Sequence, residues 1–286
     1  MNDLRLEDII DENKIKEYRR NINSVEKGNI LILGVGALLI CKPDIHIYAD
    51  LARWEIQLRY RSGKLGNYKI ENYNEDFLKK YKRGYFIEWR LVDNYKKKFF
   101  NDIDYILDTN DNDSVKMITG DNFRKAMDLA VTTPFRVVPF FDPGVWGGQW
   151  MKEVCDLDKS SKNYAWCFDC VPEENSLFIR FGDVRVEIPS IDLVLYKPKE
   201  LLGNSIFNRF GAEFPIRFDF LDTMEGGNLS LQVHPLKEYI KDKFGMSYTQ
   251  DESYYMLDTA EDATVYLGMK DNVDKEEFLT ALKEAQ

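Results

Sequence analysis

NLSLQVHP, at residues 228–235, alternates apolar and polar side chains along its whole length. Successive side chains of a β-strand point to opposite faces, so this stretch predicts a strand with two unlike faces. The expected core-facing side chains are Leu229, Leu231 and Val233. The other face then presents Ser230, Gln232 and His234 in a row. A hydroxyl, a carboxamide and an imidazole on one face indicate a site for a metal or a polar ligand.

A second stretch, DESYY at residues 251–255, places Glu252 at the start of an aromatic strand. Together, Ser-x-Gln-x-His-Pro and this later glutamate resemble type I phosphomannose isomerase. That family consists of zinc-dependent cupins that interconvert mannose 6-phosphate and fructose 6-phosphate. Support comes from VWGG at residues 145–148 and TVYLG at residues 264–268, and the resemblance covers roughly residues 136–286.

The resemblance implies a metal centre whose ligands are Gln232, His234 and Glu252. Zinc is the implied ion, with iron or manganese as alternatives, because nitrogen and oxygen ligands suit all three. The metal would act as a Lewis acid on the sugar while a proton moves between C1 and C2. The expected catalytic residues are Ser230, which would contact the substrate or a water bound to the metal, and Arg217.

The chain departs from the family pattern at two positions where the family carries lysine, here Asp219 and Gln250. Replacing a cation by Asp219 opposes the binding of a phosphate dianion. Arg217 lies on the same face by strand alternation, so it either compensates for the lost charge or pairs with Asp219.

The family's fourth ligand, a histidine, and its second cupin half have no counterpart here, because the only histidines are His46 and His234. Either the chain is a fragment of a longer protein, or the site uses three protein ligands and water. The alternative to an isomerase is a non-catalytic metal-binding cupin that senses or binds a carbohydrate.

The 286 residues carry a net charge of −10, which argues against a nucleic-acid or anionic-membrane partner. No apolar run approaches the ~20 residues of a membrane helix, and the charged N-terminus has no signal-peptide core, so we expect a cytoplasmic protein. The expected partner is a small sugar or sugar phosphate. The sequence leaves the oligomeric state open.

The expected fold class is α+β with two domains, an α/β domain of unknown role at residues 1–133 and a β-rich cupin or jelly-roll domain at residues 134–286. Strands are predicted over 29–33, 44–50, 85–90, 104–108, 135–141, 177–181, 184–188, 214–221, 229–233, 253–257 and 264–267. Helices are predicted over 51–60 and 121–131, within 1–27 and after Asp274, with helices or loops over 199–211 and 236–244.

Two further motifs favour structural roles. GVGA at residues 34–37 follows an apolar run, but it lacks the third glycine of a dinucleotide site and the Gly-Lys-Ser/Thr of a P-loop. A phosphotransferase in the N-terminal domain is therefore the least favoured function. Cys167 and Cys170 have the spacing of a metal knuckle or redox pair, but a strand would separate their thiols, so we expect reduced cysteines.

Overall fold

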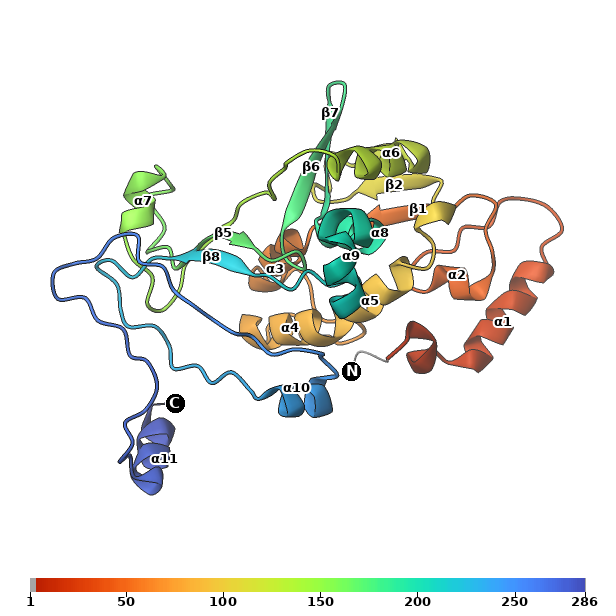
Figure 1. The fold of residues 1–286 in the computed structure, drawn as a ribbon. Helices are drawn as coiled ribbons and strands as arrows, with labels where there is room; N and C mark the ends of the chain where they lie inside the picture. The colour runs from red at the N-terminus through yellow and green to blue at the C-terminus, as the bar shows by residue number, and fades with distance from the viewer. Residues whose placement is uncertain (1–3, 286) are drawn as a thin grey trace.

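Three small sheets and the helices around them form the described part of the chain, residues 4–285, in the computed structural model (Figure 1). The first sheet has the order β1-β2-β3, with β1 (Ile47–Asp50), β2 (Tyr105–Asp108) and β3 (Lys116–Thr119). The second has the order β4-β5-β8, with β4 (Phe141–Asp142), β5 (Trp166–Cys170) and β8 (Phe218–Leu221). The third is a hairpin of β6 (Ser176–Phe181) and β7 (Val184–Pro189). The mixture of helices and strands expected from the sequence is confirmed, but residues 4–285 form no barrel.

Helices make up the other regular elements of residues 4–285. They are η1 (Leu6–Ile9), α1 (Glu12–Asn23), α2 (Ala37–Ile40), α3 (Arg53–Arg61), α4 (Phe77–Arg83), the π-helix η2 (Gly84–Glu88), α5 (Trp89–Lys96), η3 (Phe100–Asp102), α6 (Gly120–Ala130), α7 (Trp150–Val154), α8 (Ile191–Tyr196), α9 (Pro198–Phe210), α10 (Lys237–Phe244) and α11 (Lys275–Glu284). Helices were expected within residues 1–27, of which 1–3 lie outside the described range. No helix of residues 4–285 is both long and apolar enough to cross a bilayer.

The main core joins residues from both sides of the boundary expected at 133–134. Helix α6 contributes Phe123 and Met127, and β2 contributes Ile106. Hairpin strand β7 contributes Val186 and Ile188 to the same cluster. Residues on the two sides of the expected boundary therefore share one hydrophobic core.

The predicted hairpin forms because Gly182 supplies a left-handed turn residue, with φ of 59°. Phe181 pairs with Val184 across the turn, and the six-residue strands keep one register throughout. Alternation buries Val186 and Ile188, whereas Val184 near the tip is exposed. The C-terminal helix is also confirmed: Asp274 accepts a hydrogen bond from the Glu277 amide at 2.9 Å and caps α11.

Two strand predictions in the N-terminal part are wrong. Residues 29–33 form no strand, and Leu31 and Leu33 point into solvent. Residues 85–90 are helical, because Tyr81, Tyr85 and Trp89 recur every four residues and pack ring against ring along one face. A short apolar run is compatible with both the strand period and the helical period, and here the segment is helical.

Three strand predictions in the C-terminal part are also wrong, whereas 177–181 and 184–188 are confirmed as β6 and β7, and the end of 214–221 is confirmed as β8. Residues 229–233, 253–257 and 264–267 are irregular, and only the end of 135–141 pairs, as β4. Leu231 and Val233, expected in a core, are 64% and 84% exposed. Alternation alone does not stabilise a strand, and the described residues place no neighbouring strand beside these segments.

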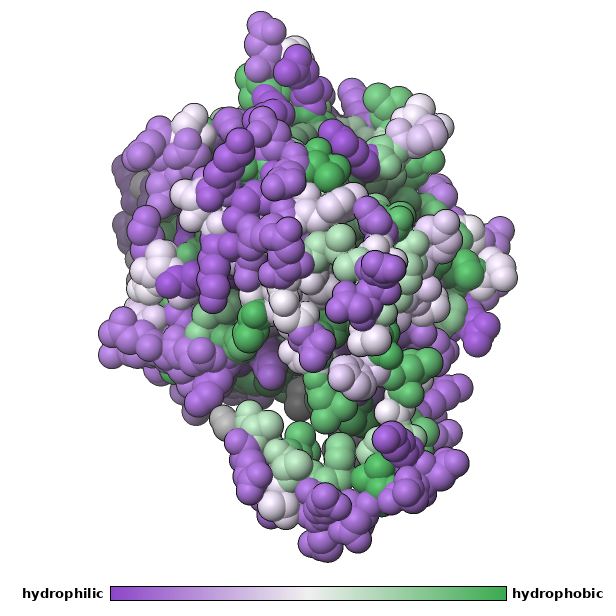
Figure 2. All heavy atoms as spheres, turned by 90° about the vertical axis from the view of Figure 1, so that its left-hand side faces the viewer, coloured by the Kyte–Doolittle hydropathy of each residue, from purple (hydrophilic) through white to green (hydrophobic). Residues whose placement is uncertain are grey.

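The face of the molecule that carries the C-terminal segment consequently shows many apolar side chains among hydrophilic ones (Figure 2). The exposed apolar residues of this segment include Leu231, Val233, Leu236, Tyr255, Leu257, Tyr266, Leu267 and Met269.

Candidate metal centre

The Trp-Gly-Gly motif anchors the chain just before the stretch NLSLQVHP. The Gly227 amide donates to the Trp146 carbonyl at 3.0 Å, and the Gly148 amide donates to the Asp222 carbonyl at 2.8 Å. A Cβ atom on Gly148 would lie only 2.1 Å from Asp222 Oδ1, so no larger residue fits there without movement. The Trp-Gly-Gly motif therefore contacts residues 222–227, which lead directly into the stretch at 228–235.

The structure brings two of the three expected ligands together. His234 Nε2 lies 3.2 Å from Glu252 Oε2, and both side chains are partly exposed. Two donors of a tetrahedral zinc ion, each about 2.1 Å from the metal, lie about 3.4 Å apart. The spacing of the two side chains therefore suits a shared cation.

A second contact fixes which nitrogen of His234 carries the proton. His234 Nδ1 lies 3.1 Å from the Gln250 carbonyl oxygen, which can only accept a hydrogen bond. The proton is therefore assigned to Nδ1, and Nε2 is left facing the Glu252 carboxylate. A lone pair directed at a carboxylate requires a cation between them, either a second proton or a metal. An Nδ1–H bonded to a backbone carbonyl is also how metal-bound histidines are oriented.

The two positions where the family has lysine both lie beside Glu252. Gln250 Nε2 donates to Glu252 Oε2 at 3.2 Å. Asp219 is close enough that burial and then the Glu252 charge raise its pKa. Hydrogen bonding to Glu252, followed by burial, raises the pKa of Tyr254 to about 12, so this phenol keeps its proton. The surroundings of the pair are acidic, which favours a cation over an anion.

The other expected site residues do not join the pair. Ser230 and Gln232 are exposed, and no contact within the described residues brings Gln232 to His234. Arg217 Nη2 binds Glu173 Oε1 at 2.7 Å, so the suggested pairing with Asp219 is wrong. Strand alternation could not predict this pairing, because Glu173 lies forty-four residues before Arg217 in the sequence.

The donor set fits a metal in part. His234 and Glu252 supply one nitrogen and one oxygen, but no group of three or more His, Cys, Asp or Glu residues in the range 4–285 is arranged to hold an ion. Gln232 would have to move to become the third ligand. The arrangement by itself can hold a cation between an imidazole and a carboxylate.

The cysteine pair offers no competing centre. A β-bulge separates Cys167 from Cys170, and Phe168 between them has φ of 54°. Burial, then the charges of neighbouring aspartates, raises the pKa of Cys167 to about 12, and burial also raises that of Cys170. Protonated thiols are poor metal ligands.

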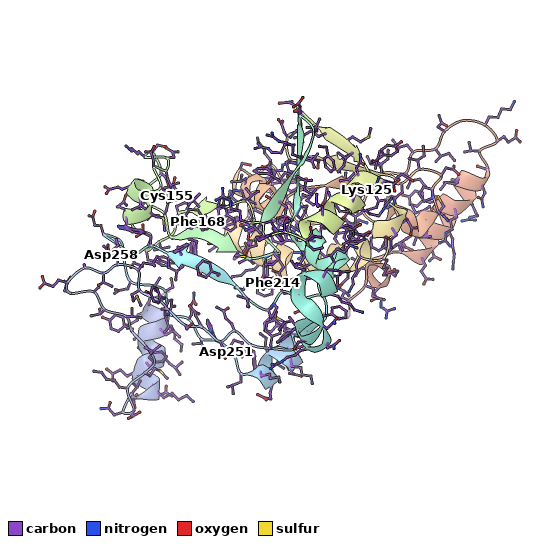
Figure 3. The ribbon with its side chains drawn as sticks, turned by 45° about the horizontal axis from the view of Figure 1, so that its top comes forward. Lys125, Cys155, Phe168, Phe214, Asp251 and Asp258 are labelled. Atoms are coloured by element: carbon purple, nitrogen blue, oxygen red, sulfur yellow. The ribbon has the colours of Figure 1, made fainter. Side chains whose placement is uncertain are left out.

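A larger cavity of about 410 Å³ lies between β5 and helices α8 and α9. Phe168 and Phe214 contribute to its wall, which is mainly apolar (Figure 3). A sugar phosphate has too many polar groups for this cavity, and it does not include His234 or Glu252.

Two buried charged groups were not recognisable from the sequence. Lys96 Nζ, fully buried, donates to Asp50 at 2.5 Å and to both oxygens of Asp192 at 2.6 and 2.7 Å. Burial opposes its charge, but the Asp192 and Asp50 carboxylates outweigh this and raise the pKa of Lys96. Burial and then the charge of Asp50 raise the pKa of Asp192.

Asp169 is the second such group. It is buried, and its Oδ1 atom has no hydrogen-bond partner within the described range. Burial and then the charge of Asp219 raise the pKa of Asp169 to about 8. Both charged groups depend on residues that only the fold brings together.

Comparison with known proteins reaches only the N-terminal part. The model of a domain of unknown function, DUF8485, matches residues 1–132. No curated protein and no solved structure matches the chain. The matched region ends before every residue of the candidate metal centre.

Proposed function

We propose that the protein is a metal-dependent aldose–ketose isomerase of the phosphomannose isomerase type, acting on a sugar phosphate. The observation that carries the proposal is the convergence of His234 and Glu252 at 3.2 Å, with the imidazole held by the Gln250 carbonyl. The sequence motif indicates the same two residues independently of their geometry. Their separation by eighteen positions makes an accidental meeting with this orientation a weak explanation.

In this proposal His234 and Glu252 hold zinc, with iron or manganese as alternatives, and Gln232 joins them from the same segment. The metal supplies Lewis acidity at the sugar carbonyl and hydroxyl groups. Glu252 balances the charge of the ion, and the Gln250 carbonyl orients the His234 ring through Nδ1, so that Nε2 faces the proposed ion. The described residues form no barrel. Membership of the cupin family therefore rests on the sequence motif and is itself part of the proposal.

The test combines metal analysis with an isomerase assay on the full chain. We expect zinc to bind in a one-to-one ratio and mannose 6-phosphate to be converted to fructose 6-phosphate. His234→Ala and Glu252→Gln should lose both properties, whereas Glu261→Gln, an exposed carboxylate on the same segment, should keep them. Turnover that survives in His234→Ala would remove the proposed site.

One observation favours a second function, a metal-binding module that binds a carbohydrate without converting it. Asp219 lies beside Glu252 in place of a lysine, so the centre lacks the cation expected near the reacting carbons. A sugar that raises the melting temperature of the zinc-loaded chain without being isomerised would support this function. Ligand at 100 times its dissociation constant adds about 2.7 kcal/mol to the free energy of unfolding.

A further inference from the structure

A small cavity with charged residues in its wall borders the candidate metal centre. It has a volume of about 270 Å³ and lies between the end of α9, the start of α10 and residues 247–251. Figure 3 shows Asp251 on the irregular segment that runs beside α10. The polar residues of its wall are Arg209, Lys237, Ser247, Tyr248, Thr249 and Asp251. A cavity of this size matches a phosphate group with part of a sugar rather than a large ligand.

The cavity wall carries more positive than negative charge. Arg209 and Lys237 are exposed cations, and neither forms an ion pair with any residue in the range 4–285. The Arg209 guanidinium lies 5.1 Å from the Phe210 ring centre, and that ring packs edge-on against Tyr248. Asp251 is the only acidic residue of the wall, so two positive charges face one negative charge.

Backbone and hydroxyl groups add donors to the same wall. Lys237 is the first residue of α10, so the positive end of this helix lies at the cavity. Ser247 adds a residue with a hydroxyl group to the wall, whereas the Tyr248 side chain is hydrogen-bonded to Glu213. Arginine, lysine, hydroxyl groups and a helix N-terminus are the donors that proteins use for phosphate monoesters.

The cavity is connected to the metal centre through two adjacent residues. Thr249 lines the cavity and donates to the Pro235 carbonyl at 2.5 Å. Gln250, the next residue, accepts from His234 Nδ1. An anion in the cavity would therefore be joined to the pair His234 and Glu252 through the adjacent residues Thr249 and Gln250.

We propose that Arg209 and Lys237 bind the phosphate group of the substrate in this cavity and so replace the lysines missing at positions 219 and 250. This assignment rests on the proposed function, because it takes a phosphorylated sugar as the ligand. Asp251 weakens the affinity for phosphate by its own charge. The positive charges of Arg209 and Lys237 nevertheless outnumber it, so the cavity favours phosphorylated over neutral sugars.

The first test titrates the metal-free full chain with inorganic phosphate at low salt, followed by calorimetry or by ³¹P line broadening. Arg209→Gln and Lys237→Gln should each weaken binding on the order of tenfold, as expected for losing one charge-assisted hydrogen bond. Asp251→Asn should tighten binding several-fold. Lys241→Gln, on the same helix but outside the cavity, is the matched control and should bind as the wild type does.

Unchanged binding in both Arg209→Gln and Lys237→Gln, or no saturable binding by the wild type, would overturn the assignment. A gain in affinity is the sharpest outcome, since an unfolded or damaged Asp251→Asn variant cannot bind more tightly. The first test needs neither metal nor turnover, so phosphate binding without isomerisation would refute the proposed function alone. Isomerisation with a KM for mannose 6-phosphate that is unchanged in Lys237→Gln would refute the phosphate cavity alone.

Discussion

The part of the chain before Asp222 and the part after it differ in how they are packed. All described residues that are buried lie at or before Asp222, whereas none of the described residues from 223 to 285 is buried. The first part contains the sheets, the hydrophobic core and the Lys96 cluster. The second contains the candidate metal pair on a segment without strands. Stability and the proposed chemistry therefore reside in different regions, and substitutions should separate them.

The largest effect on stability is expected at Lys96. Lys96→Met leaves the carboxyl groups of Asp50 and Asp192 buried without a cation, which should lower the free energy of unfolding by about 3–5 kcal/mol. The matched control is Lys98→Met, because Lys98 pairs with Glu7 at 2.7 Å on the surface. That pair should contribute less than about 1 kcal/mol. Urea unfolding of both variants measures the difference, and equal losses would contradict a special role for the buried cluster.

The next effect is expected where the two regions meet. Gly148→Ala puts a methyl group against Asp222 and should cost about 1–3 kcal/mol by overpacking. At Gly227 the added Cβ would lie 3.5 Å from Trp146, an ordinary contact, so Gly227→Ala should be better tolerated. Thermal unfolding of the two variants compares them, and a smaller loss in Gly148→Ala would show that the contact is not tight.

A pH-dependent effect is expected at Asp169. Because its folded-state pKa is raised to about 8, the unfolded chain releases this proton first as the pH rises. The contribution of Asp169 to stability is therefore complete below about pH 4 and is lost progressively up to about pH 8. Asp169→Asn removes this loss, so its advantage over the wild type should grow by roughly 1–2 kcal/mol between pH 5 and pH 6. A constant difference across this range would show that Asp169 ionises normally.

The smallest effect is expected in the exposed segment. Val233 is 84% exposed, so Val233→Ser should change the free energy of unfolding by no more than about 0.5 kcal/mol. Val186→Ser, which places a hydroxyl in the core, should cost more than about 2 kcal/mol. A large loss in Val233→Ser, measured by urea unfolding, would mean that residues 228–235 are packed in solution.

The sequence predicted those elements whose signals are local. The turn at Gly182 specifies the β6–β7 hairpin, and the cap at Asp274 specifies α11, because each depends on residues a few positions apart. The run at residues 85–90 was assigned the wrong period, because a short aromatic segment satisfies both. The strands predicted at 229–233 and 253–257 failed because a strand also needs a neighbour, which no local pattern supplies.

The candidate site divides in the same way. A motif identified His234 and Glu252, and the structure places them in contact. The motif did not reveal that Arg217 binds Glu173, or that Arg209 and Lys237 line one cavity. Those contacts join distant parts of the chain, and no local sequence pattern indicates them.

X-ray absorption spectroscopy of the zinc-loaded protein tests the central claim most directly. The pair His234 and Glu252 predicts a first shell of nitrogen and oxygen at about 2.0–2.2 Å, with the outer-shell pattern of one imidazole. That imidazole pattern should disappear in His234→Ala. A sulfur shell at about 2.3 Å, or a spectrum that His234→Ala leaves unchanged, would place the metal elsewhere and contradict the account.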